Sequence, residues 1–211
     1  MVGEIKIYIE GGADGKQAKS KLREGFGDFL DELRQIARNK RIGWTLVACG
    51  SRNSAYEDFC TAIKSSPTVF HVLLVDSEDA VTKGSSIWSY LNARDSWDCP
   101  PGLDDNRCFL MEQSMETWLI ADRKALIDYY GQKFKPNSLP TTSDIESIDK
   151  KELMKKLLAA TKDCESKGPY HKTRHGFDIL AKVRPEVVRK SASHCQRLFS
   201  RLSEEMGERI E

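Results

Sequence analysis

Short aliphatic runs alternate in the first half of the chain with stretches whose hydrophobic residues lie three or four positions apart. The short runs predict β-strands, at residues 6–9, 44–48, 69–75 and 108–111. The helical spacing predicts helices at residues 16–38 and 55–64. Alternating strands and helices predict an α/β fold. We therefore expect a mainly parallel sheet of about four strands, flanked by helices.

The second half of the chain is predicted to be mostly helical. Residues 79–107 are rich in Gly, Pro and Asp without a periodic pattern, so we expect a long loop of the kind that is often functional or mobile. Hydrophobic spacing predicts helices at residues 114–130, 149–161, 176–183 and 185–206. Asp149 and Glu152 form a plausible capping box for the second of these helices.

This pattern divides the chain into two parts. Residues 1–130 are expected to form an α/β domain that binds a metal. Residues 131–147 contain Pro136 and Pro140 and predict a linker, after which the chain is helical to its end. We expect residues 131–211 to be a helical extension with a basic surface, packed on the same core.

Composition favours a globular protein of the cytoplasm. The chain has 211 residues, of which 39% are hydrophobic and 31% charged. It has no run of about 18 apolar residues, so we expect no membrane partner. The start of the chain runs straight into the first strand, without a signal-peptide pattern. The six cysteines include no CxxC pair, which argues against structural zinc and disulfides and favours a reducing compartment.

Charge is unevenly distributed, although the net charge is only +1. Residues 166–201 contain nine Lys or Arg and two Asp or Glu, an excess of +7, whereas residues 95–116 are acidic. Such blocks suit a site where carboxylates and a metal face a basic surface that receives phosphates. From charge alone, solvated helices of mixed charge are the simpler interpretation.

Two predicted strands end at a carboxylate, Glu10 and Asp76. Ligands of a parallel sheet bind beyond the carboxyl ends of its strands, so both side chains are expected at one edge. Glu78 would lie on the same face as Asp76, about 6–7 Å away, if the chain stayed extended. Clustered carboxylates need a cation, and the usual one is a divalent metal such as Mg²⁺, with Mn²⁺ as a substitute. A polar loop after a buried strand explains the Asp76–Glu78 pair equally well.

Further candidates lie outside these strands. Glu116 lies at the margin of an apolar stripe and needs a partner, which a salt bridge to Lys or Arg would also provide. Arg52 follows a strand and could contact a phosphate or cap the next helix.

The segment from Tyr170 to Gly176 carries four basic or imidazole side chains, those of His171, Lys172, Arg174 and His175. Gly168 and Pro169 precede it, which favours a loop over a helix that would place both histidines on one zinc ion. We expect Lys172 and Arg174 to contact phosphate, with His171 or His175 assisting. A solvated basic turn is an equally good interpretation.

Several ordered motifs span most of the chain. They are Tyr8-Ile-Glu10-Gly-Gly, Ala48-Cys-Gly50-Ser-Arg52-Asn, Leu74-Val-Asp76-Ser-Glu78, Met111-x-Gln113-x-Met115-Glu116-x-Trp118 and Tyr170-His-Lys172-x-Arg174-His175-Gly176-Phe177. With these motifs the chain resembles the Toprim superfamily and, more closely, an uncharacterised bacterial family within it, related to OLD-like nucleases. The superfamily's Asp-x-Asp is replaced here by Asp76-x-Glu78, which leaves one-metal and two-metal chemistry open.

The resemblance implies a Mg²⁺-dependent nuclease centre. It assigns Glu10 as general base or metal ligand, Asp76 and Glu78 as metal ligands, and Glu116 as a further ligand or an orienting residue. Lys172 is the candidate for the lysine that stabilises the transition state in OLD-type enzymes. Relatives often occur beside ABC or SMC-like ATPases in anti-phage defence loci, which implies an ATPase partner.

The leading hypothesis is therefore phosphodiester hydrolysis of DNA or RNA by the effector of an antiviral defence system. The alternative is a regulatory module without catalysis, which binds a metal or another ligand and docks on an ATPase. Nucleotide transfer in the manner of primases is a third possibility. The sequence leaves the nucleic acid and a homo-oligomeric state open.

Overall fold

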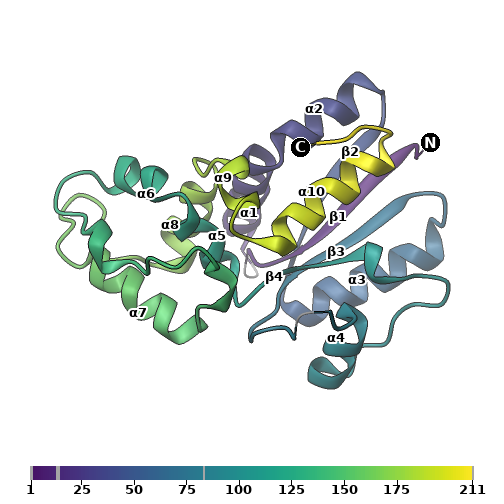
Figure 1. Ribbon diagram of the computed structural model, residues 1–211. Helices are drawn as coiled ribbons and strands as arrows, with labels where there is room; N and C mark the ends of the chain where they lie inside the picture. The colour runs from purple at the N-terminus through teal and green to yellow at the C-terminus, as the bar shows by residue number, and fades with distance from the viewer. Residues whose placement is uncertain (1, 13–14, 83, 211) are drawn as a thin grey trace.

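The computed structural model describes residues 2–12, 15–82 and 84–210. Its four strands, all parallel, form one sheet in the order β2-β1-β3-β4 (Figure 1), which confirms the predicted fold class. The strands are β1 (Glu4–Glu10), β2 (Gly43–Gly50), β3 (Phe70–Asp76) and β4 (Cys108–Met111). No helix of the described residues is long and apolar enough to cross a membrane.

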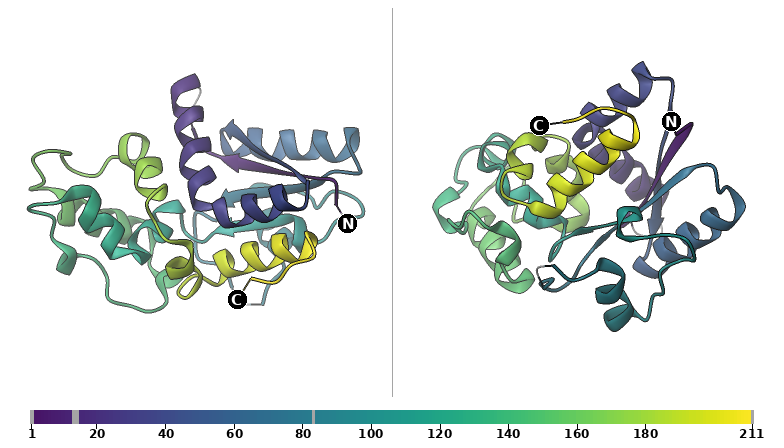
Figure 2. Two further views of the ribbon diagram at one scale, coloured as in Figure 1. Left: turned by 90° about the horizontal axis from the view of Figure 1, so that it is seen from above. Right: turned by 45° about the vertical axis from the view of Figure 1, so that its right-hand side comes forward.

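Alternating side chains give the sheet two apolar faces, each covered by helices (Figure 2). Ile5, Ile7 and Ile9 of β1 share one hydrophobic cluster with residues of α1 (Lys16–Phe29), α2 (Asp31–Asn39) and α10 (Ser193–Glu205). Tyr8 of the same strand faces the other way. It belongs to a second cluster with residues of α3 (Arg52–Ser65) and α4 (Ile87–Asp95). Every residue of β3 is consequently buried.

Three predicted long helices are each divided in two. Residues 16–38 form α1 and α2, residues 114–130 form α5 (Met115–Ala121) and α6 (Arg123–Tyr130), and residues 185–206 form α9 (Pro185–Arg189) and α10. The break before α6 has a clear cause in the buried Asp122, whose carboxylate accepts a hydrogen bond from the backbone N–H of Ala125. The same carboxylate pairs with Arg184, so a tertiary contact ends one helix and starts the next.

Two predicted loops are wrong in part. Residues 79–107 contain α4, whose Ile87, Trp88 and Leu91 are buried against the sheet, and a 3-10 helix at Asp105–Arg107. The basic segment after Pro169 is also helical, because α8 (Lys172–Leu180) begins four residues earlier than predicted. Between β1 and α1, Ala13 and Asp14 lie outside the described residues.

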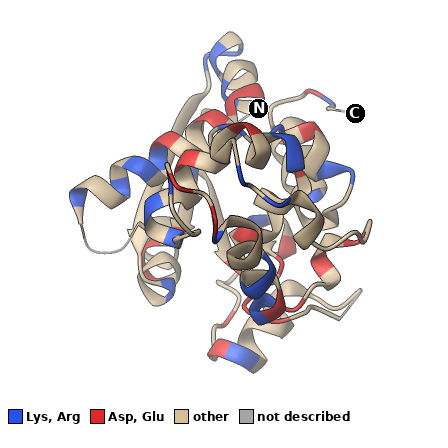
Figure 3. Ribbon diagram, turned by 90° about the vertical axis from the view of Figure 1, so that its left-hand side faces the viewer, with Lys and Arg blue, Asp and Glu red and all other residues tan. Residues whose placement is uncertain are grey.

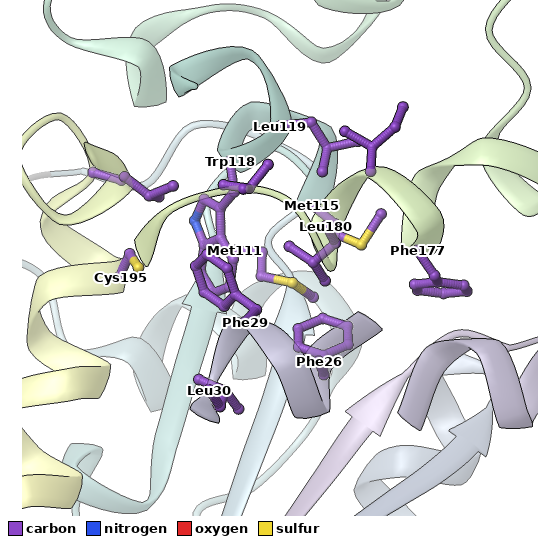
Figure 4. Close-up of a cluster of buried hydrophobic side chains, with 14 of the residues drawn as sticks. Phe26, Phe29, Leu30, Met111, Met115, Trp118, Leu119, Phe177, Leu180 and Cys195 are labelled. Atoms are coloured by element: carbon purple, nitrogen blue, oxygen red, sulfur yellow. The ribbon is translucent and has the colours of Figure 1, made fainter. Parts of the chain in front are cut away.

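Side chains of residues 131–211 belong to the same hydrophobic cluster as those of β1, α1 and α5. Helix α7 (Lys150–Thr161) starts at the predicted cap, where an Asp149 oxygen accepts from the backbone N–H groups of Lys151 and Glu152. Two 3-10 helices, Pro136–Ser138 and Ile145–Ser147, precede it. The cluster drawn in Figure 4 joins the two parts, because side chains of α1, β4, α5 and α8 meet there.

Helix α8 lies against α1 at an unusually close backbone contact. A Cβ atom built on Gly25 of α1 would lie 2.7 Å from the carbonyl oxygen of Phe177 in α8, closer than real Cβ atoms approach. Gly25 therefore lets the two helices touch. This contact fixes where the first turn of α8, with Lys172, lies relative to the sheet.

Substitution of Gly25 by Ala should lower the free energy of unfolding by about 1–3 kcal/mol, because the added methyl group forces α1 and α8 apart. Gly27→Ala in the same helix is the matched control, since its Cβ would approach only the Arg34 side chain, at 3.9 Å. That control should leave stability unchanged or raise it by up to ~1 kcal/mol. Urea unfolding measures the free energy of unfolding of both variants. Equal changes in this free energy for the two substitutions would contradict the close contact at Gly25.

Candidate metal centre

The topology brings Glu10 and Asp76 together. Strands β1 and β3 are hydrogen-bonded neighbours, paired in register from Ile5 with Phe70 to Ile9 with Leu74. The helices that follow them in the chain, α1 and α4, cover opposite faces of the sheet. The chain thus diverges beyond these two strand ends, which leaves a crevice at the switch point of the sheet. Each strand ends in a carboxylate, so both acids line that crevice.

Glu78 completes a cluster of three carboxylates. Each of Glu10, Asp76 and Glu78 offers an oxygen, and these three atoms lie within 4.8 Å of one another. The chain is not extended at Glu78, which has a φ of +72°, so the expected same-face arrangement along a strand is wrong. The Glu78 N–H instead donates to the carbonyl of Gln113, which turns the chain back toward the sheet edge. The predicted convergence holds, although by a different backbone route.

Arg52 holds Glu10 in place. Its Nη1 donates to Oε2 of Glu10 at 3.2 Å and also to the carbonyl oxygen of Asp76. The other guanidinium nitrogens bind both oxygens of Asp95, at 3.1 and 2.7 Å. Predicted as a phosphate contact or a helix cap, Arg52 is paired with acids on two sides and acts as a clamp within the site.

Asp76 is 3% exposed and has a donor on each carboxylate oxygen. Its Oδ1 accepts from the backbone N–H of Met115 at 2.8 Å, and its Oδ2 accepts from Nζ of Lys172 at 3.2 Å. Glu116 lies behind it, 1% exposed, with Oε1 accepting from the Tyr170 hydroxyl at 2.9 Å. Oε2 of Glu116 lies 3.6 Å from Lys172 and has no hydrogen bond with the described residues.

Lys172 is the member of the basic segment that reaches the carboxylates. Its side chain is 47% exposed, so it faces solvent as well as Asp76 and Glu116. His171 and Arg174 are exposed beside it, His171 as the N-cap residue of α8. His175 is buried and its Nδ1 contacts the Tyr130 hydroxyl at 3.2 Å, which gives it a structural place instead of a substrate contact. Figure 3 shows basic and acidic segments intermixed on this side of the molecule.

Four residues contribute to the site without having been predicted from the sequence: Asp95, Gln113, Lys150 and Tyr170. Lys150 donates to Glu78 at 2.6 Å, and its backbone N–H donates to the side-chain oxygen of Gln113. Tyr170 was named only as part of a motif, and Asp95 was counted only within an acidic region. Their partners are distant in the sequence, so nothing in the local pattern could have identified them. The charge of each site acid is nevertheless a signal that some cation must face it.

Burial sets the protonation of the cluster. It raises the pKa of Glu10 to about 7, Asp76 adds to the rise, and Arg52 opposes it. Burial also raises the pKa of Asp76 against the opposing charge of Lys172. At Glu78 burial raises the pKa, but the hydrogen bond from Lys150 outweighs this and the pKa lies below its usual value. The site therefore holds more negative charge than its own cations balance comfortably.

A pocket of about 190 Å³ opens beside the cluster. Glu10, Asp76 and Lys172 line one side of it, and Met111, Met115 and Phe177 form an apolar wall. The three clustered carboxylates could hold a metal ion in this setting, because carboxylate oxygens are the donors that hard divalent cations prefer.

The chain belongs to a family described as a domain of unknown function (DUF4276), whose sequence model matches residues 9–203. The match includes all the residues of the cluster. Searches of curated proteins and of solved structures returned no match.

The raised pKa of Glu10 predicts how the metal-free protein responds to pH. A folded-state pKa above the usual 4.5 means that the folded protein holds the Glu10 proton more tightly than the unfolded chain does. The protonated carboxyl therefore stabilises the folded state fully below pH 4.5, and this stabilisation is lost as the pH rises through about 7. Urea unfolding in the presence of a chelator measures the free energy of unfolding at pH 5 and pH 8. Between these two pH values, the free energy of unfolding should fall less for Glu10→Gln than for the unchanged protein. Parallel behaviour of the two proteins would contradict the assignment.

Proposed function

We propose that this protein is a Mg²⁺-dependent nuclease that hydrolyses phosphodiester bonds in DNA or RNA. The observation that carries the proposal is the convergence of Glu10, Asp76 and Glu78 within 4.8 Å, with the Lys172 ammonium 3.2 Å from Asp76. Acidic clusters at adjacent strand ends of a parallel sheet, beside a cationic side chain, suit the binding of a metal and a phosphate together. The resemblance to the Toprim superfamily supports the same function.

The donor set fits Mg²⁺ or Mn²⁺. All three residues offer carboxylate oxygens, and Mg²⁺ is usually held by one or two carboxylates with water and substrate phosphate completing its shell. When bound, the ion would polarise the phosphate and lower the pKa of a bound water. Glu10 has a pKa near 7, which suits either a ligand or a base that accepts a proton from the attacking water.

The surrounding residues position these groups. Arg52 holds the Glu10 carboxylate against the backbone N–H of Asp76, which donates to Oε2 of Glu10 at 3.2 Å. Lys172 is anchored by buried carboxylates but half exposed, so its ammonium can donate to a phosphate oxygen that enters the pocket. Exposed Arg174 and His171 flank it on the first turn of α8 and can contact neighbouring phosphates.

The ATPase partner and the defence role stay predictions from the family resemblance. A module that binds the metal without catalysis, docked on an ATPase, is the competing function. Such a module would bind the metal at the same site but would not cleave nucleic acid. A cleavage assay combined with a measurement of metal binding therefore separates it from a nuclease.

Cleavage of plasmid DNA and of structured RNA should require Mg²⁺ or Mn²⁺. We expect Asp76→Asn and Glu10→Gln each to lower the rate at least about 100-fold, because each replaces a carboxylate that would hold the ion with a neutral amide. Asp128→Asn is the control, since Asp128 is exposed on α6 and pairs only with Lys124 among the described residues. Full cleavage by both site variants would refute the proposal.

Addition of Mg²⁺ should stabilise the folded chain. At a concentration 100 times the dissociation constant, binding contributes about 2.7 kcal/mol, which raises Tm by roughly 5–11 °C for a chain of this size. Asp76→Asn should lose most of this shift, and Asp128→Asn should keep it. A full shift without cleavage, both with and without an added ATPase, would favour the non-catalytic module.

A further inference from the structure

We propose that the centre takes a single divalent ion, and that the Lys172 ammonium permanently occupies the place of a second. The inference rests on the metal site of the proposed function but concerns its stoichiometry, which the sequence left open. It assigns Lys172 as a built-in cation, anchored by protein carboxylates and available to the phosphate.

The contacts of Lys172 are those of a cation bridging two buried acids. Its Nζ lies 3.2 Å from Oδ2 of Asp76 and 3.6 Å from Oε2 of Glu116. These carboxylates are 3% and 1% exposed, so water cannot compensate their charge. Oε2 of Glu116 has no hydrogen bond with any described residue, so the nearby ammonium is what balances it. A metal ion between the same two acids would lie against this positive charge and be repelled by it.

Charge balance also favours one ion. Four carboxylates, those of Glu10, Asp76, Glu78 and Glu116, face three cations, those of Arg52, Lys150 and Lys172. Arg52 is shared with Asp95, but Arg94 pairs with that carboxylate as well. The other partner of Arg94, Asp79, is 79% exposed and lies in solvent, so it is left out of the count. The cluster thus keeps one net negative charge when all its acids are ionised. One divalent ion would leave a net charge of +1, which matches the single negative charge of a phosphodiester.

A second divalent ion would bring the same centre to +3, with Lys172 still in place. The ion and the ammonium would repel each other, most strongly on the buried side where Asp76 and Glu116 lie. The position of Lys172 is also set by the backbone, since it is the first residue of α8 and α8 is held against α1 at Gly25. The backbone of Lys172 is thus fixed beside the site, and the two buried carboxylates hold its ammonium there.

Counting bound Mn²⁺ tests the inference without any nucleic acid. Calorimetry and electron paramagnetic resonance of the full chain should show one ion, with the spectrum of an isolated Mn²⁺. Lys172→Met keeps the length of the side chain and removes its charge, so it should take up a second ion and give a spin-coupled pair. Lys162→Met is the control, because Lys162 is exposed at the end of α7, and it should bind one ion.

Two coupled ions in the unchanged protein would overturn the inference, and so would a folded Lys172→Met that binds only one. The first result does not depend on whether the variant folds. In the double variant Lys172→Met with Glu116→Gln, the second ion should be lost again, because one of its ligands is removed.

The outcome is separable from that of the nuclease proposal. One bound ion without cleavage would refute the nuclease and leave the single-ion centre standing. Cleavage by a protein that binds two ions would support the nuclease and refute the single-ion centre.

Discussion

Four carboxylates held out of water at one edge of a sheet impose the constraint on which the rest of this structure depends. Glu10, Asp76, Glu78 and Glu116 are each partly or fully buried within a few ångströms of one another or of a shared cation. Such a group is unfavourable unless positive charge is brought to it. Much of the tertiary structure around the sheet serves to deliver that charge.

The compensating cations come from three separate helices. Arg52 begins α3 on one side of the sheet, whereas Lys150 and Lys172 begin α7 and α8 in the helical extension. Each lies at the first residue of its helix, so the basic side chains point at the site from helix starts that surround it. The extension is thereby part of the centre and not an appendage, which explains why its core is continuous with that of the α/β domain.

Compensation is nearly complete and stops short by one charge. Without these cations the buried carboxylates would strongly destabilise the fold. Burial, together with the neighbouring charge of Asp76, raises the pKa of Glu10 in the metal-free protein despite the opposing charge of Arg52. The three clustered carboxylates could hold a metal ion, and the half-exposed Lys172 keeps a positive group beside them.

The sequence alone determined the strands, their parallel arrangement and the acids at their ends, because period and residue type act over a few neighbouring positions. It predicted Glu10, Asp76 and Glu78 as one cluster, since sheet topology follows from the order of the elements. Tertiary structure alone decided the turn at Glu78, the breaks in the long helices and the early start of α8. It also decided that Arg52 and Lys150 serve the carboxylates, since those pairings join residues that are 42 and 72 positions apart. Contacts at such separations depend on how helices pack, which no local pattern encodes.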